Sequence, residues 1–100
     1  MDVNVINIAR DFSRAPAGRY VSDGPNSGER FRTEFLVPAL SGEQAVTVEL
    51  DGTRPYGSSF LEEAFGGLVR LGFVAGDLLR RINLHSSDPS LVSEIKGYLH

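Results

Sequence analysis

The stretch from residue 45 to residue 71 changes its hydrophobic period near its middle. Over Ala45–Leu50 apolar residues alternate with polar ones, which is the period of a half-buried strand. After a turn at Asp51 and Gly52, apolar residues recur at helical spacing over Ser59–Leu71. A strand that leads into an amphipathic helix is the repeating unit of α/β folds, so this stretch predicts that class.

The remaining sequence adds strand and helix patterns in alternation. Asn26 is the expected N-cap of the first helix, with Glu29 three residues on, and Pro38 is expected to kink or end that helix. Asp77–Ile82 fits a short helical turn. The predicted strands are Val3–Ile8, Arg19–Ser22, Ala45–Leu50 and Arg81–Ser86. The predicted helices begin near Asn26, at Ser59 and, with Asp88 as N-cap before Pro89, in the last stretch.

The order β-β-α-β-α-β-α predicts a small α/β fold. We expect a mixed, at least partly parallel sheet of about four strands with three helices packed on it. At 100 residues the chain has the size of one domain, and we expect residues 1–100 to form it.

Composition narrows the possible partners and compartments. The formal net charge of −3 provides no basic field, which makes nucleic acid a poor partner. The sequence has no cysteine, which excludes disulfides, thiolate chemistry and cysteine-based zinc sites. Its first residues resemble neither a signal peptide nor a membrane span, so we expect a cytoplasmic protein without membrane contact.

Residues for catalysis are scarce. The two histidines are His85 and His100, and nothing near His85 in sequence suggests a catalytic arrangement. Glu49 and Asp51 near a strand end form a conceivable carboxylate cluster with Glu62 and Glu63, but turn and helix-dipole roles explain these acids better. No Walker-type phosphate loop is present. We therefore predict a non-enzymatic protein without metal or cofactor.

The turn Gly57-Ser58-Ser59 opens the second predicted helix. Ser59 matches a capping box, in which its hydroxyl bonds the N–H of Glu62 and the carboxylate reaches back. Ser58 has no such role and lies near unpaired helix N–H groups, where a phosphate would be stabilised. The alternative is that Ser58 is merely a small polar residue of the turn.

Gly66 and Gly67 interrupt the same helix. Each glycine costs about 1 kcal/mol relative to alanine. Their spacing places them opposite the apolar stripe, beside Glu62, Glu63 and Arg70. This predicts a close approach to the helix backbone, either by another protein or by the chain's own Gly18–Gly28 loop.

Two motifs carry a resemblance to a known family. The first is the stretch VTVELDGTRPYGSSFLEEAFGGLVRLG, which resembles the signature of STAS domains, the fold of bacterial anti-sigma factor antagonists. The second is GRYVSDGPNSGERFR, which together with DGTRPYGSSFLEEAFGGLVR resembles a prokaryotic STAS-like domain of unknown function. Gly57 occupies the position that the antagonists fill with Asp.

The resemblance implies a regulatory protein-interaction module. It implies that Ser58 is phosphorylated by a partner with a histidine-kinase-type ATPase fold, and that phosphorylation weakens docking and releases this partner. The expected docking face consists of Ser58, Ser59, Glu62, Glu63, Gly66 and Gly67.

The Gly18–Arg32 loop lies outside the STAS signature and leaves three uses open. It can pin the sheet to the first helix through salt bridges, form part of the partner surface, or bind a small ligand such as a nucleotide or another anion at the helix start. The candidate residues for this alternative, ligand-binding function are Arg19, Asp23, Asn26, Ser27 and Arg30.

Overall fold

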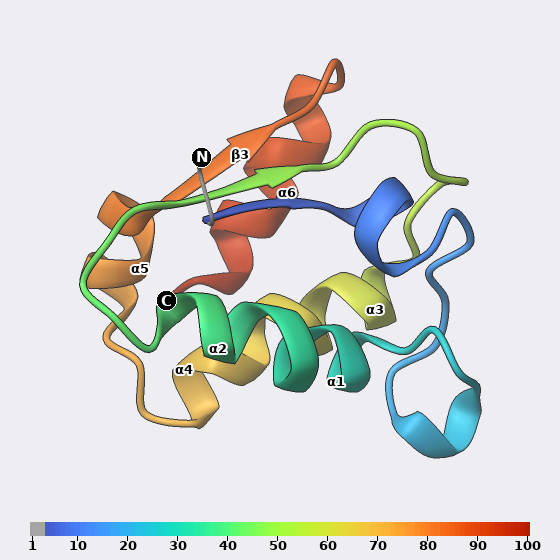
Figure 1. The fold of residues 1–100 in the computed structure, drawn as a ribbon, viewed down its shortest axis with the longest axis horizontal. Coiled ribbons are helices and arrows are strands. Elements are labelled where there is room, and N and C mark those ends of the chain that lie inside the picture. The colour runs from blue at the N-terminus through green and yellow to red at the C-terminus, as the bar shows by residue number, and fades with distance from the viewer. Residues whose placement is uncertain (1–3) are drawn as a thin grey trace.

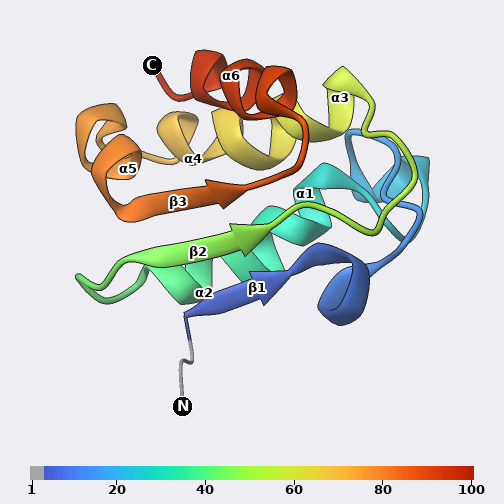
Figure 2. The same cartoon turned by 90° about the horizontal axis from the view of Figure 1, so that it is seen from above.

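The centre of the fold is a three-stranded parallel sheet, counted over residues 4–100, which the computed structural model describes. Its strands are β1 (Val5–Asn7), β2 (Val46–Glu49) and β3 (Ile82–His85), in the order β1-β2-β3. Both pairings are parallel, with Ile6 opposite Val48 and Val48 opposite Leu84 (Figure 2). Val3, the predicted start of the first strand, lies outside the described residues.

The predicted strand at Arg19–Ser22 is wrong. Residues Val21–Asp23 form a short 3-10 turn, η2. The backbone N–H groups that would pair with a neighbouring strand donate to side chains instead. Asp23 Oδ2 accepts from Tyr20 N at 2.8 Å, and Glu29 Oε1 accepts from Val21 N at 2.9 Å. The described sheet therefore has three strands rather than four, and it is parallel rather than mixed.

Two long helices each consist of α-helical ends around a π-helical turn. Helix 28–40 contains α1 (Gly28–Phe31), η3 (Arg32–Leu36) and α2 (Val37–Leu40). Helix 58–70 contains α3 (Ser58–Leu61), η4 (Glu62–Gly66) and α4 (Gly67–Arg70). The other helical segments are η1 (Ile8–Phe12), α5 (Ala75–Arg81) and α6 (Pro89–Tyr98). The ambiguous stretch Asp77–Ile82 thus lies mostly in a helix.

Local signals at the helix ends are partly correct. Asp88 caps α6, since its Oδ1 accepts from Ser90 N at 3.0 Å. The predicted N-cap Asn26 is wrong, because Ser27 caps α1 by accepting from Arg30 N at 3.1 Å. The helix continues past Pro38 to Leu40, after a widened turn in which Val37 N donates to the carbonyl five residues earlier.

Helices 28–40 and 58–70 lie on one face of the sheet, side by side and running in the same direction (Figure 1). Val46 and Val48 of β2 point into the core, while Thr47 and Glu49 are only half-buried. No helix of residues 4–100 has both the length and the apolar character needed to cross a bilayer. The buried hydrophobic side chains include Ile8, Phe31, Leu36, Val46, Val48, Leu50, Phe60, Phe65, Leu68, Leu78 and Ile95.

Gly28 allows the two long helices to touch through their backbones. A Cβ atom on Gly28 would lie 3.1 Å from Ala64 N and would overlap the carbonyl oxygen of Phe60. Only a residue without a side chain fits between these backbones.

Gly28→Ala is expected to destabilise the domain by about 1–3 kcal/mol, because helix 58–70 must move away to admit the methyl group. Gly97→Ala in α6 is the matched control, since a Cβ there meets no atom within 4 Å, and it should stabilise by about 0.4–1 kcal/mol. Urea unfolding of both variants tests this. Equal free energies of unfolding for Gly28→Ala and wild type would show that the helices are not in close contact.

Candidate functional site

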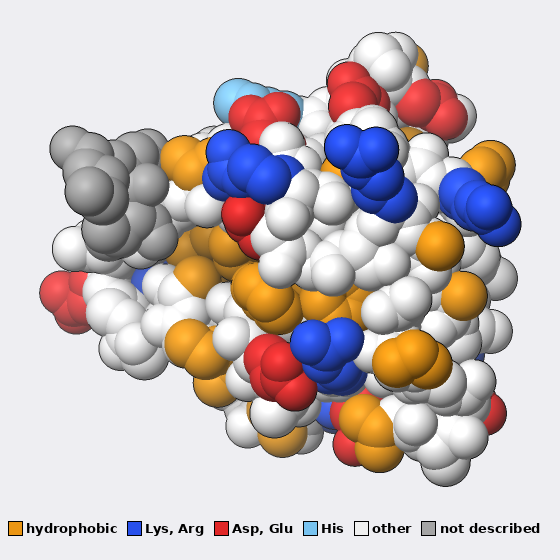
Figure 3. All heavy atoms as spheres, turned by 45° about the vertical axis from the view of Figure 1, so that its right-hand side comes forward, with side chains coloured by type: hydrophobic (Ala, Val, Ile, Leu, Met, Phe, Trp, Pro, Cys, Tyr) orange, Lys and Arg blue, Asp and Glu red, His pale blue; other side chains and the backbone are white. Residues whose placement is uncertain are grey.

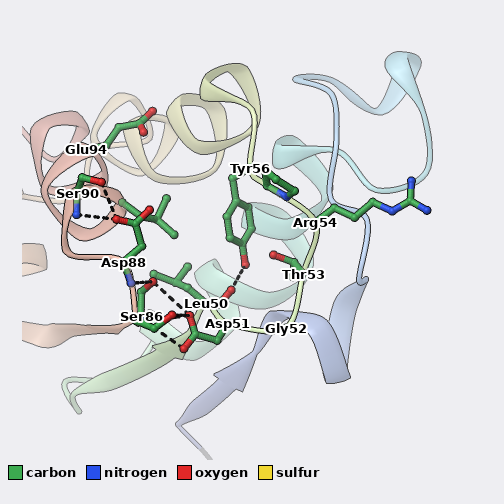
Figure 4. A pocket seen from close by; sticks show the side chains of 13 residues that line it. Leu50, Asp51, Gly52, Thr53, Arg54, Tyr56, Ser86, Asp88, Ser90 and Glu94 are labelled. Atoms are coloured by element: carbon green, nitrogen blue, oxygen red, sulfur yellow. Dashed lines mark hydrogen bonds between the residues drawn. The ribbon is translucent and has the colours of Figure 1, made fainter.

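A cleft of about 530 Å³ lies at the carboxyl edge of the sheet (Figure 4). The loop after β2 forms one wall, and the loop after β3 with the first turns of α6 forms the other. In α/β folds with parallel strands, ligands bind at this edge, because the loops that follow the strands gather there. The lining residues are Leu50–Tyr56, Ser86–Asp88, Ser90, Leu91 and Glu94.

Asp51 joins the two walls of the cleft. Its Oδ1 accepts from Ser87 N at 3.0 Å, and both serine hydroxyls of the other loop, Ser86 and Ser87, also donate to it. The backbone hydrogen bond from Ser87 is the main reason why the pKa of Asp51 lies below its usual value. Asp51 therefore acts as an ionised clasp between the loops.

Tyr56 anchors the loop that leads to helix 58–70. Its hydroxyl donates to the carbonyl oxygen of Leu50 at 2.7 Å, and its ring contacts Phe60 at a centroid distance of 5.9 Å. Burial raises the pKa of this phenol, so it remains a donor at neutral pH. The anchor determines where Gly57 and the helix start lie.

Ser58 and Ser59 are both exposed at the start of α3. The predicted capping box at Ser59 is wrong, because the N-cap is Gly57 and no side chain caps this helix. The helix begins one residue earlier than predicted, which places Ser59 inside its first turn. Over residues 4–100, neither hydroxyl makes a hydrogen bond, so both are available to a partner.

Glu62 and Glu63 take part in a network with three arginines. Glu62 accepts from Arg19 Nη1 at 2.5 Å and from Arg70 Nη1 at 2.6 Å. Hydrogen bonds from Arg70 and then Arg19 hold the pKa of Glu62 below its usual value. Glu63 is buried and pairs with the buried Arg32, whose Nη1 lies 2.8 Å from Glu63 Oε2 and 2.5 Å from the Glu63 carbonyl oxygen. The network ties helix 28–40 and the loop before it to helix 58–70.

The prediction that Gly66 and Gly67 form an exposed face is wrong, since both are buried. A close approach to the backbone does occur within the chain, but it comes from Arg32 and Glu62 rather than from the predicted Gly18–Gly28 loop. A Cβ on Gly67 would overlap Arg32 Nη1, and one on Gly66 would lie 2.5 Å from Glu62 Oε2. The glycines make room for the charged network and are not open to a partner.

The candidate ligand residues of the Gly18–Arg32 loop are engaged within the chain. Arg19 binds Glu62 and Glu63, Asp23 accepts from Tyr20 N, and Ser27 caps α1. Asn26 donates to the carbonyl oxygen of Ala15, and Arg30 donates to that of Pro25 and pairs with Glu34. None of these side chains lines the cleft at the carboxyl edge. Of the three uses left open by the sequence, the loop forms salt bridges, but those of Arg19 reach helix 58–70 rather than join the sheet to the first helix.

The four acidic residues of the conceivable metal cluster have separate partners. Glu49 pairs with His85 at 2.9 Å, Asp51 with the serines, and the remaining two with arginines. Within residues 4–100, no group of three or more His, Cys, Asp or Glu side chains is arranged to hold a metal ion.

The anchor Tyr56 and the clasp between Asp51 and Ser87 were not among the residues predicted for the site. One signal was present in the sequence: Asp51 and Ser87 both follow predicted strands, and the carboxyl ends of parallel strands meet at one edge. The sequence alone does not show that these two strands are neighbours, so this signal could not place Asp51 next to Ser87.

Tyr56→Phe is expected to lower the free energy of unfolding by about 0.5–1.5 kcal/mol, because the hydrogen bond to Leu50 is lost. Amide exchange in residues 51–57 should accelerate at the same time. Tyr20→Phe is the control, since that side chain is half exposed. If both variants behave alike, the hydroxyl of Tyr56 does not anchor the loop.

The pairing of Glu62 predicts a pH dependence of stability. Because its folded-state pKa is depressed, the stabilisation is present above the usual carboxyl pKa of 4.5 and is lost as the pH falls through the lower folded value. Wild type should therefore lose more stability than Glu62→Gln between about pH 6.5 and about pH 3. Glu43→Gln, at an exposed residue, should follow wild type. Parallel curves for all three proteins would contradict the pairing.

The comparisons with known proteins agree with this architecture. No curated protein and no solved structure matches the chain. One family model matches residues 27–91 and is described as a STAS-like domain of unknown function (DUF4325). The matched region runs from the cap of α1 into α6, so it includes β2, β3, both long helices and the two loops of the cleft. This chain belongs to the family of STAS-like domains of unknown function.

Proposed function

We propose that this chain is a non-enzymatic regulatory module that docks onto a partner protein through the start of helix 58–70. The proposed partner is an ATPase of the histidine-kinase type, and Ser58 is the proposed site of its phosphorylation. Membership of the STAS-like family supports an interaction role, and the resemblance of Gly57-Ser58-Ser59 to the antagonist motif supports the position.

The observation that carries the proposal is an exposed hydroxyl without a hydrogen bond at the first residue of a helix. Ser58 has this position, and its hydroxyl makes no hydrogen bond within the described residues 4–100. The first N–H groups of a helix have no intrahelical partner, so an anion at this end is stabilised by donors and by the helix dipole. A phosphate on Ser58 would therefore be accommodated without disturbing existing bonds.

The accessible docking face is smaller than the sequence suggested. The face consists of Ser58, Ser59 and the partly exposed Glu62. Tyr56 and the rim of the cleft lie next to it. Three residues of the predicted face are buried beneath it, where they hold the helix in place: Glu63, Gly66 and Gly67. In this proposal the partner contacts a rigid helix start and an adjoining hollow.

The proposal predicts that Ser58 is the phosphorylated residue. Purified ATPases of the histidine-kinase type from the same organism are incubated with the chain and ATP, and the mass of the chain is measured. We expect the mass of one phosphate in wild type and Ser59→Ala, and no added mass in Ser58→Ala. The Ser59→Ala control is informative because both hydroxyls are exposed and neither caps the helix.

Binding is measured on the same proteins before and after phosphorylation. A complex that forms with unmodified chain and weakens after modification fits the proposal. Absence of both a complex and an added phosphate with every such ATPase would refute it.

A further inference from the structure

Two arginines differ from the other seven in how their guanidinium groups are used. All nine lie within the described residues 4–100, and seven of the side chains donate to a carboxylate or to a backbone carbonyl. The seven are Arg10, Arg19, Arg30, Arg32, Arg70, Arg80 and Arg81. Arg14 and Arg54 are exposed, and their side chains have neither kind of bond.

Arg14 and Arg54 lie next to each other although 40 positions separate them in sequence. Arg54 N donates to the carbonyl oxygen of Arg14 at 2.8 Å, which joins the segment after β1 to the loop after β2. A hollow of about 580 Å³ beside Arg14 is lined by Asn7, Ala9, Arg10, Arg14, Asp51 and Gly52, whereas Arg54 borders the cleft at the carboxyl edge. The Arg54 side chain points away from the cleft that Glu94 and Asp88 line (Figure 4).

The carboxylates close to this pair already have partners. Asp11 pairs with Arg10 at 2.8 Å. Asp51 accepts from the neutral Ser87, so it stays ionised, and within residues 4–100 it makes no ion pair with Arg14 or Arg54. The positive charge of Arg14 and Arg54 therefore faces solvent in a chain whose formal net charge is −3. Figure 3 turns this side of the molecule forward and shows separate basic groups spread across it.

We infer that Arg14 and Arg54 are the contact point for an acidic segment of the partner protein. This rests on the proposed function and names the chemistry of the partner's surface. Planar guanidinium groups bind carboxylates through paired hydrogen bonds, and arginine is enriched in interfaces. An acidic protein segment fits better than nucleic acid, because two arginines on a net acidic chain neutralise too few phosphates for affinity.

Ser58 follows Arg54 closely in the sequence. Arg54 and Ser58 are four residues apart, so their Cα atoms are separated by at most about 14 Å. The Debye length at physiological salt is about 8 Å, and a phosphoserine carries a charge of about −2. Because the upper limit of this separation exceeds the Debye length, a phosphate on Ser58 weakens the attraction of Arg54 for an acidic segment mainly at low salt.

The inference is tested without any partner by NMR titration with hexaglutamate. We expect the side-chain Nε signals of Arg14 and Arg54 and the amides of residues 52–54 to shift. The affinity for the peptide should fall about three- to tenfold in Arg54→Glu, and it should fall with added salt. Arg80→Glu is the matched control, with the same charge change at a side chain that is 73% exposed, and it should bind as wild type does.

Three outcomes of the titration would overturn the inference: no shift at Arg14 and Arg54, equal losses in Arg54→Glu and Arg80→Glu, or the same shifts with inorganic phosphate or single-stranded DNA at equal charge concentration. Far-ultraviolet circular dichroism of each variant confirms that it is folded.

A second measurement separates this inference from the proposed function. Association of the ATPase partner with Arg14→Glu/Arg54→Glu should be slower than with wild type and less sensitive to salt. If the partner binds both proteins equally, the inference fails while the proposed function stands. If no such ATPase binds wild type, the proposed function fails, and the peptide titration still decides the inference.

Discussion

The close contact between helix 28–40 and helix 58–70 determines the rest of the structure. At Gly28 the two backbones touch, and one turn later Arg32 passes over Gly67 to reach Glu63. Glycines weaken a helix, so their presence here is explained by the space they leave rather than by helix propensity. A buried ion pair adds little net stability, but a wrong alignment would leave both charges unpaired. The pair therefore selects one register between the helices.

The position of the candidate site follows from this register. Helix 58–70 is held against helix 28–40, and Tyr56 ties the preceding loop back to the end of β2. Because the strands are parallel, the loops after β1, β2 and β3 all open at the same edge. The start of helix 58–70, the cleft clasped by Asp51 and the two free arginines consequently share one side of the molecule.

The predictions that were correct depend on short-range physics. The alternation of β2 and the cap of α6 by Asp88 are decided by neighbours in sequence. The predictions at Arg19–Ser22 and at Ser59 were wrong because distant groups decide them. Glu29 occupies an N–H group that a strand at Arg19–Ser22 would use, and Glu62 binds arginines from outside its own turn instead of capping the helix.

The sequence by itself determined the α/β class, the STAS-like family and the place of Ser58 within one residue of a helix start, because hydrophobic period and turn chemistry act locally. Only the tertiary structure decided that Gly66 and Gly67 are buried beneath a charge network, and that Arg14 lies beside Arg54. These facts depend on which segments meet across long separations in the chain. Burial and charge pairing at such contacts are properties of the packed helices and loops, and no local pattern encodes them.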